Sequence, residues 1–218
     1  MRAQTSIVVP TFANDEAVQR VTRLVKGNTS VSYELIVVDN GSSARGYVAT
    51  CNQGMAAAHG DVLVLMNDDC QPQPGWLEPL VDAVQRGVWL CSPDWPSARL
   101  AGHCLVLSRE AYEYTGGLDE RYVHTNADHH LEMTLARANV PICQVPESHV
   151  LHLAEDPLRI HYRKSCFLGN HEQLPNTGQM YLDDQATFES IWGDDRPRNY
   201  WPGDSMESWA TDYVWSAA

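Results

Sequence analysis

The sequence predicts an α/β fold in which a mostly parallel sheet is flanked by helices. Three observations predict it. Short apolar runs of strand length recur along the first half of the 218-residue chain, helical patterns separate them, and polar turn residues end each run. Parallel strands joined through helices give this alternation. The length leaves room for one ordinary domain with a short appendage.

The first half of the chain alternates strands and helices. Ser6 to Val9 and Glu34 to Val38 are short apolar runs that end at a proline or a turn sequence, which predicts buried strands. Asp15 to Lys26 has apolar residues at helical spacing, acids in its first turn and a glycine beyond its end, so it predicts a helix. A second helical pattern covers Val48 to Ala58, and Val62 to Met66 predicts a third strand. Right-handed crossovers would make the three strands parallel.

The second half continues with weaker patterns. Apolar spacing and short apolar runs predict a helix at 76–86, a strand near 88–91, a strand at 101–107, a short helix at 109–114, a helix at 128–138 and a strand at 150–153. We expect residues 1–171 to form one compact domain that contains all of these elements.

The composition changes after residue 171. Residues 172–218 contain nine acidic and two basic side chains, and four of the seven tryptophans of the chain. So many aromatic residues argue against disorder. We expect an acidic, Trp-rich extension of irregular structure that packs on the domain or acts as a lid or an oligomer contact.

Charge and cysteine usage exclude several classes of protein. The chain has 28 acidic and 15 basic residues, a formal charge of −13, so a large nucleic-acid or anionic-membrane surface is not expected. The six cysteines form no CxxC pair, which favours reduced thiols over a zinc ribbon or a disulfide framework. No stretch approaches the ~20 apolar residues of a membrane span, and we expect a cytoplasmic protein with no transmembrane segment.

Polar residues follow the three parallel strands of the first half. Ligands of open α/β sheets bind beyond the carboxyl ends of such strands, where this chain has Pro10-Thr11-Phe12, Asp39-Asn40-Gly41 and Asn67-Asp68-Asp69. Neither GxGxxG nor GxxxxGK[ST] is present to cradle a phosphate. Adjacent carboxylates are oxygen donors suited to Mg²⁺ or Mn²⁺, which would neutralise a diphosphate, although a solvated turn or a helix cap also explains them.

Several motifs in order resemble the family 2 glycosyltransferases with the GT-A fold. These motifs are IVVPTF, ELIVVDNGS, ATCNQGMAAAHGDVLVLMNDDCQPQPGWL, AGHCLVLSREAYEYTGGLDERY, ADHHLEMTLARAN and VPESHVLHL, and they span residues 6–153. The resemblance implies a Rossmann-like GT-A domain. It also implies a nucleotide-diphosphate sugar donor, with a UDP-sugar favoured, a Mn²⁺ or Mg²⁺ ion, and sugar transfer to an acceptor hydroxyl.

The resemblance assigns the donor-side residues by position. Pro10, Thr11 and Phe12 match the motif that lines the nucleobase pocket, and Asp39 matches the acid that binds the base edge. Asn67-Asp68-Asp69 stands at the DxD-type motif, with Asn in place of the first acid. Asp68 would contact ribose or metal, and Asp69 would ligate the metal. His152 matches a histidine that closes the metal site in some relatives, although a packed or surface histidine is the alternative.

Asp128 matches the catalytic base of the family. A base is required because an acceptor hydroxyl is a poor nucleophile until its proton is removed. Direct displacement with one base inverts the anomeric centre. A helix N-cap is the alternative role for Asp128. Ala127 stands where relatives often have a supporting glutamate.

Two other functions stay open at this point. A nucleotidyltransferase shares the layout, but it usually has a Gly-rich, basic loop after the first strand, and residues 11–15 have neither feature. A catalytically silent sugar-nucleotide binding module is suggested by Asn67 and Ala127. The acceptor classes are a glycan, a lipid-linked glycan, a protein or a modified nucleobase, and the C-terminal extension is a candidate contact in a homo-oligomer.

Overall fold

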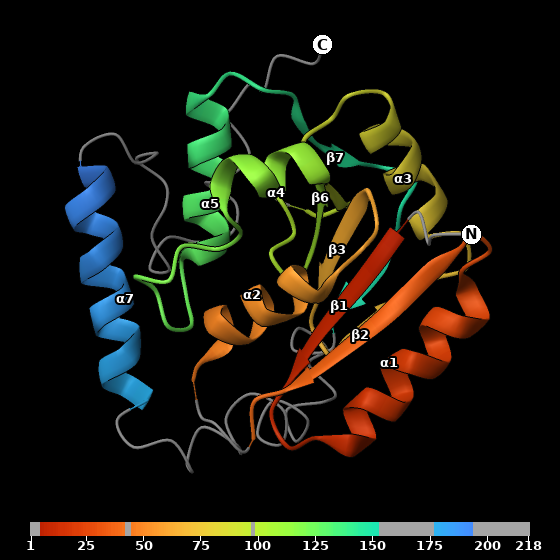
Figure 1. Cartoon of the computed structure of the whole chain (residues 1–218), viewed down its shortest axis with the longest axis horizontal. Coiled ribbons are helices and arrows are strands. Elements are labelled where there is room, and N and C mark those ends of the chain that lie inside the picture. Colours follow the sequence, from red (N-terminus) through yellow and green to blue (C-terminus); the bar gives the residue numbers. More distant parts are fainter. Residues whose placement is uncertain (1–4, 42–44, 97–98, 153–176, 194–218) are drawn as a thin grey trace.

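The computed structural model describes residues 5–41, 45–96, 99–152 and 177–193. A six-stranded sheet with the order β2-β1-β3-β6-β5-β7 forms its centre, and helices cover both faces (Figure 1). This arrangement confirms the predicted mixed α/β fold.

The first half of the sheet is parallel, as predicted. β1 (Thr5–Thr11) lies between β2 (Tyr33–Asp39) and β3 (Val62–Met66) and pairs in parallel with both. Helix α1 (Asp15–Asn28) connects β1 to β2, and α2 (Tyr47–Ala57) lies between β2 and β3 in the chain. Every residue of β1 and β3 is buried, which explains why both read as continuous apolar runs.

The second half of the sheet is mixed. β6 (Cys104–Ser108) pairs antiparallel with β3 and with β5 (Leu90–Pro93), and β5 pairs in parallel with β7 (Ile142–Val145). The sequence patterns did not predict β7, because this four-residue edge strand is only partly buried and contains a glutamine.

The two faces of the sheet bury separate apolar clusters. Helices α1 and α3 (Leu77–Gln85) pack on one face, against the side chains of Ile7 and Val64. Helices α2, α4 (Arg109–Thr115) and α5 (Ala127–Arg137) pack on the other face, against Val8 and Leu65. Neighbouring residues of a strand point to opposite faces, so each buried strand serves both clusters.

A second, two-stranded sheet was not predicted in full. β4 (Cys70–Pro72) pairs antiparallel with β8 (Val150–His152), and Cys70 lies opposite His152. A three-residue strand such as β4 has no periodicity to detect. This pairing brings His152 beside the acidic turn that follows β3.

The expectation of irregular structure in the C-terminal extension is wrong for residues 177–192, which form helix α7 (Thr177–Trp192). Asp184, Phe188 and Trp192 recur every four residues and are buried. Phe188 and Trp192 join the apolar cluster that contains α2 and α5. Figure 1 shows α7, in blue, beside α5 at the margin of the molecule. The rest of the extension lies outside the described residues, and so does Cys166.

The described cysteines are free thiols, and all are buried except Cys143, which is partly buried. None of the described helices has the length and apolar character needed to cross a membrane.

Candidate active site

Hydrogen bonds connect the carboxyl end of β1 to its neighbours. Thr11 Oγ1 donates to Asp68 Oδ2 at 2.7 Å, and Asn40 N donates to Thr11 O at 2.9 Å. The strand register places Thr11 opposite Asp39. The ends of β1 and β2 and the acidic turn after β3 therefore meet at one edge of the sheet, as the sequence predicted.

Asp39 organises the loops that follow β1 and β2. Its Oδ1 accepts hydrogen bonds from Ala13 N at 2.9 Å and from Gly41 N at 2.8 Å. Ala13 has a positive φ of 48°, an uncommon conformation for a residue other than glycine, and the bond to Asp39 holds it there. Pro10 is buried, and Phe12 beside this loop is partly buried.

Asp69 and His152 form the candidate metal site. Asp69 is 3% exposed, and its Oδ1 lies 3.2 Å from His152 Nε2. At metal–ligand distances of about 2.1 Å, two ligands at a right angle lie about 3 Å apart, so this pair fits a divalent ion between the two atoms. No group of three or more His, Cys, Asp or Glu side chains within the described ranges is placed to hold a metal. Nucleotide phosphate and water would have to complete the coordination.

Asp68 precedes Asp69 in the same turn. Burial raises the pKa of its carboxyl to about 6, the hydrogen bond from Thr11 opposes this rise, and the neighbouring charge of Asp69 adds to it. Asp68 O also accepts a hydrogen bond from the Arg20 guanidinium at 3.2 Å. Two carboxylates in succession are thus held close together, and a bound cation would relieve their repulsion.

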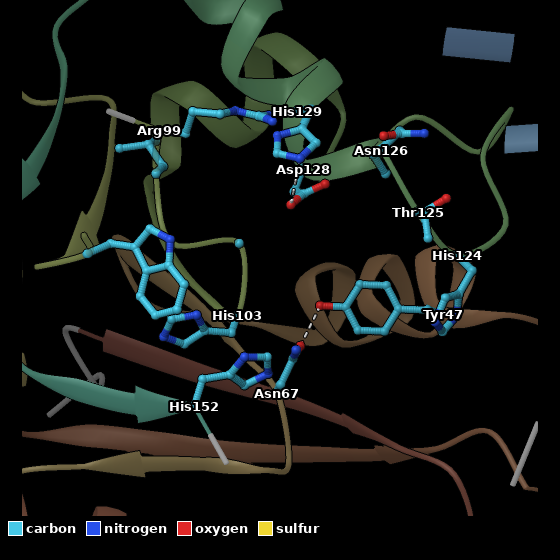
Figure 2. A pocket seen from close by; sticks show the side chains of 14 residues that line it. Tyr47, Asn67, Arg99, His103, His124, Thr125, Asn126, Asp128, His129 and His152 are labelled. Atoms are coloured by element: carbon cyan, nitrogen blue, oxygen red, sulfur yellow. Dashed lines mark hydrogen bonds and ion pairs between the residues drawn. The ribbon is translucent and has the colours of Figure 1, made fainter. Parts of the chain in front are cut away.

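A cavity of about 370 Å³ joins three of the predicted site residues. Figure 2 shows Asn67, Asp128 and His152 around it, although they come from the turn after β3, the start of α5 and the end of β8. The other lining residues are Tyr47, Trp95, Arg99, Leu100, Gly102, His103, His124, Thr125, Asn126, Ala127 and His129.

Asp128 is exposed to this cavity. It is the second residue of α5, and Asn126 occupies the N-cap position, so Asp128 is not the cap residue. Its side chain is 32% exposed, and its Oδ2 lies 4.0 Å from His129 Nε2. Burial raises the pKa of the Asp128 carboxyl, and the charge of Arg99 opposes the rise. A carboxylate with a raised pKa is a better proton acceptor than an ordinary surface aspartate.

Gly102 leaves the space that Asp128 occupies. A Cβ atom at position 102 would lie 2.1 Å from Asp128 Oδ2, far closer than a van der Waals contact. Sequence patterns could not predict this contact, because the two residues lie on different segments of the chain.

Aromatic rings line one wall of the cavity. The His103 and His152 rings stack with a centroid distance of 4.6 Å, and Trp95 meets His103 edge to face at 4.7 Å. Burial and the neighbouring His152 lower the pKa of His103 to about 3, so this imidazole is neutral at pH 7. Sequence reasoning missed Trp95 and His103; tryptophan near a turn was the only available signal, and it is too common to select a site residue.

Tyr47 contacts the DxD-type turn from α2. Its hydroxyl donates to Asn67 Oδ1 at 2.8 Å, and its ring packs against His124 with a centroid distance of 5.7 Å. This bond gives the Asn67 side chain a defined partner. Sequence reasoning also missed Tyr47, which lies just after a loop with no site motif of its own.

Sequence comparisons agree with the resemblance. Residues 43–98 match the model of glycosyl transferase family 2. The chain is 25% identical over 257 residues to the uncharacterized protein y4gI of Sinorhizobium fredii, covering 86% of this chain and 27% of that protein. The chain therefore spans about a quarter of the length of this relative.

Solved glycosyltransferase structures share the fold. The mannosyltransferase PcManGT of Pyrobaculum calidifontis, in complex with GDP-Man and Mn²⁺, superposes with a TM-score of 0.59 at 14% identity, covering 88% of this chain and 72% of that one. Glucosyl-3-phosphoglycerate synthase of Mycobacterium tuberculosis, with Mn²⁺, UDP and phosphoglyceric acid, gives 0.60 at 17% identity and covers 88% and 79%. The catalytic domain of Drosophila β1,4-galactosyltransferase 7, with xylobiose, gives 0.54 at 16% identity and covers 66% and 65%.

Proposed function

We propose that this chain, which has the GT-A fold and a family 2-like glycosyltransferase sequence, is a metal-dependent glycosyltransferase. It transfers a sugar from a nucleotide-diphosphate sugar, with a UDP-sugar favoured, to an acceptor hydroxyl and inverts the anomeric centre. The observation that carries this proposal is the shared cavity: Asp128 lines it together with His152, which also lies against the buried carboxylate of Asp69.

The donor nucleotide is assigned to the edge formed by β1 and β2. Pro10, Thr11 and Phe12 would line the nucleobase pocket, and Asp39 would bind the base edge. Asn67 and Asp68 would contact the ribose side of the donor. In support, hydrogen bonds connect Thr11 to Asp68 and order the loop around Asp39. The mannosyltransferase and the phosphoglycerate synthase were solved with GDP-Man and with UDP, respectively.

Asp69 and His152 would hold Mn²⁺ or Mg²⁺. When bound, such an ion stabilises the negative charge of the departing diphosphate. A protein with a formal charge of −13 requires compensation of this kind to bind an anionic donor. The separation of 3.2 Å between Asp69 Oδ1 and His152 Nε2 supports this assignment.

Asp128 would accept the proton of the acceptor hydroxyl. Its carboxylate is open to the cavity, and its raised pKa favours proton transfer. Trp95 offers an aromatic surface in the same cavity, on which the C–H groups of a sugar can pack. This supports an acceptor that itself carries a sugar.

The test is calorimetric titration of the whole chain with UDP, GDP and their sugar nucleotides, with and without Mn²⁺, followed by a transfer assay. We expect one nucleotide to bind only with Mn²⁺, and Asp69→Ala to remove that binding and transfer with it. Asp61→Ala is the matched control, because Asp61 is exposed and precedes β3 at the opposite end from the acidic turn. Equal Mn²⁺-dependent binding in Asp69→Ala would contradict the metal assignment.

The variant Asp128→Asn tests the proposed base independently of donor binding. The amide has nearly the same size but cannot accept the proton, so we expect unchanged donor binding and transfer reduced by about 10²- to 10⁴-fold. A fully active Asp128→Asn enzyme would contradict the assigned base. Binding without turnover in the wild type would indicate a silent binding module, and pyrophosphate release from a nucleoside triphosphate would indicate a nucleotidyltransferase.

A further inference from the structure

Helix α7 contributes one buried carboxylate, that of Asp184, which is 1% exposed. Its Oδ1 accepts a hydrogen bond from Val123 N, and its Oδ2 accepts from His124 N and Thr125 N, each at 2.7 Å. Thr125 Oγ1 lies 3.4 Å from the same Oδ2. Three successive backbone N–H groups therefore point at a single side chain.

This geometry fixes a loop that lies outside the regular helices and strands. A buried carboxylate is costly unless hydrogen bonds compensate it, and three short bonds to N–H groups do so here. Beside it, Asn126 Nδ2 donates to Gln185 Oε1 at 3.2 Å. The segment 123–126 is thus attached to α7 along its whole length.

Helix α7 is itself firmly placed. Phe188 and Trp192, one and two turns beyond Asp184, are buried in the apolar cluster around α2 and α5. Trp192 Nε1 donates to His130 Nδ1 at 3.0 Å, and the Arg137 guanidinium lies 4.1 Å from the Trp192 ring centre. The Asp184 carboxylate therefore sits on a rigid support that also contacts α5.

The attached loop forms part of the cavity wall and leads into the candidate base. His124, Thr125 and Asn126 all line the cavity, and Figure 2 shows them along the wall between Asp128 and Tyr47. Asn126 has a positive φ of 63° at the N-cap of α5, two residues before Asp128. His124 packs on Tyr47, whose hydroxyl bonds Asn67. The loop thus contacts both the base side and the DxD side of the cavity.

We propose that Asp184 is a positioning residue for sugar transfer, which sets the 123–126 wall and through it the orientation of Asp128. The proposal rests on the glycosyltransferase function proposed above. It assigns α7 a role in the reaction although none of the side chains described for α7 lines the cavity.

The variant Asp184→Asn tests the proposal with little change in size. Its amide keeps one oxygen acceptor but turns an NH₂ group toward N–H donors, so at least one of the three bonds is lost. A small displacement of a catalytic group is costly, and we expect kcat to fall by about tenfold to a hundredfold. The KM for the donor and Mn²⁺-dependent nucleotide binding should stay unchanged, because Asp184 does not contact the donor edge.

Amide hydrogen exchange gives a readout that does not depend on activity. We expect faster exchange at residues 123–125 in Asp184→Asn, with unchanged protection in β1 and β3. Asp183→Asn is the matched control, because it makes the same chemical change at an exposed position of the same helix. This control should leave both exchange and transfer as in the wild type.

Each outcome decides the proposal. Faster exchange confined to 123–125 together with a lower kcat supports it. Wild-type exchange and wild-type kcat in Asp184→Asn would overturn it, and so would a uniform loss of protection across the sheet, which indicates a general structural role. If the wild type transferred no sugar from any donor, the proposed function would fail, and the exchange rates at 123–125 would still decide whether Asp184 holds this wall.

Discussion

Residues 5–69 and residues 90–152 contribute three strands each to one sheet, and they position site residues in different ways. In the first region, parallel pairing alone carries Thr11, Asp39 and Asn67 to the same edge. In the second region, Asp128 comes from the start of a helix and His152 from a short strand paired with β4. The proposed donor side is thus built by parallel pairing within one sheet, whereas the proposed catalytic side joins a helix start, a separate two-stranded sheet and the side-chain contacts between them. Single substitutions away from the chemistry should therefore disturb the second region more than the first.

The largest expected effect concerns Glu132, a buried carboxyl in the second region. Glu132 is 5% exposed, and burial raises its pKa from 4.5 to about 7, with the Arg99 charge opposing the rise and the Asp128 charge adding to it. Between these two pKa values, the folded state keeps a proton that the unfolded chain releases. The free energy of unfolding must therefore fall as the pH rises from about 4.5 to about 7.

Glu132→Gln removes this titration. Relative to the wild type, its free energy of unfolding should increase by about 2.5 kcal/mol between pH 5 and pH 8, since each pKa unit corresponds to about 1.4 kcal/mol and part of the difference between the two pKa values falls below pH 5. Urea unfolding at several pH values measures the difference. Glu113→Gln, at an exposed position on α4, should show the same pH dependence of the free energy of unfolding as the wild type. If Glu132→Gln also showed the pH dependence of the wild type, Glu132 would ionise in the folded protein as it does in the unfolded chain.

The next largest effect concerns the first region, where a packing change should lower stability and leave nucleotide binding unchanged. A Cβ atom at Gly54 of α2 would lie 2.3 Å from Val8 Cγ1 and 3.1 Å from Val38 Cγ2. Overpacking costs about 1–3 kcal/mol, more than the ~1 kcal/mol that alanine gains over glycine inside a helix. We expect Gly54→Ala to lower the free energy of unfolding by about 2 kcal/mol. Nucleotide affinity, measured on the folded fraction, should not change; a stabilised variant would show that α2 moves away easily.

Sequence patterns predicted the first region well because its signals are local. The buried strands β1 and β3 read as unbroken apolar runs, and α1 carries an amphipathic pattern with acids in its first turn. Parallel topology then placed the strand-end residues together without knowledge of any side-chain contact. The family resemblance was still required to suggest roles for them, and these roles stay predictions.

The second region and the C-terminal extension could not be predicted to the same extent. Trp95 and His103 line the cavity because of contacts between segments that have no common sequence pattern. Helix α7 was missed because its buried residues, Asp184, Phe188 and Trp192, occur in a strongly acidic segment whose composition suggested irregular structure. Four-residue spacing was present, but a buried aspartate among exposed acids does not show in an apolar pattern.

The smallest expected effect is the most direct test of the contrast between the two regions. In Gly102→Ala, the new Cβ would lie 2.1 Å from Asp128 Oδ2, so the carboxylate must rotate away from its present position. We expect transfer to fall by about tenfold, because a misplaced base removes protons less efficiently. Mn²⁺-dependent nucleotide binding should stay at the wild-type level, since the three atoms nearest to the new Cβ all belong to Asp128.

The control for this variant is Gly27→Ala near the end of α1, where a Cβ would meet no atom within 4 Å. It should leave transfer and nucleotide binding unchanged. Steady-state transfer rates and calorimetric titration of the same preparations measure both quantities. If Gly102→Ala lowered nucleotide binding as much as transfer, the two regions would respond as one unit, and the separation between a backbone-built donor side and a packing-built catalytic side would be wrong. A loss of transfer with unchanged nucleotide binding would show that the substitution acts through the orientation of Asp128.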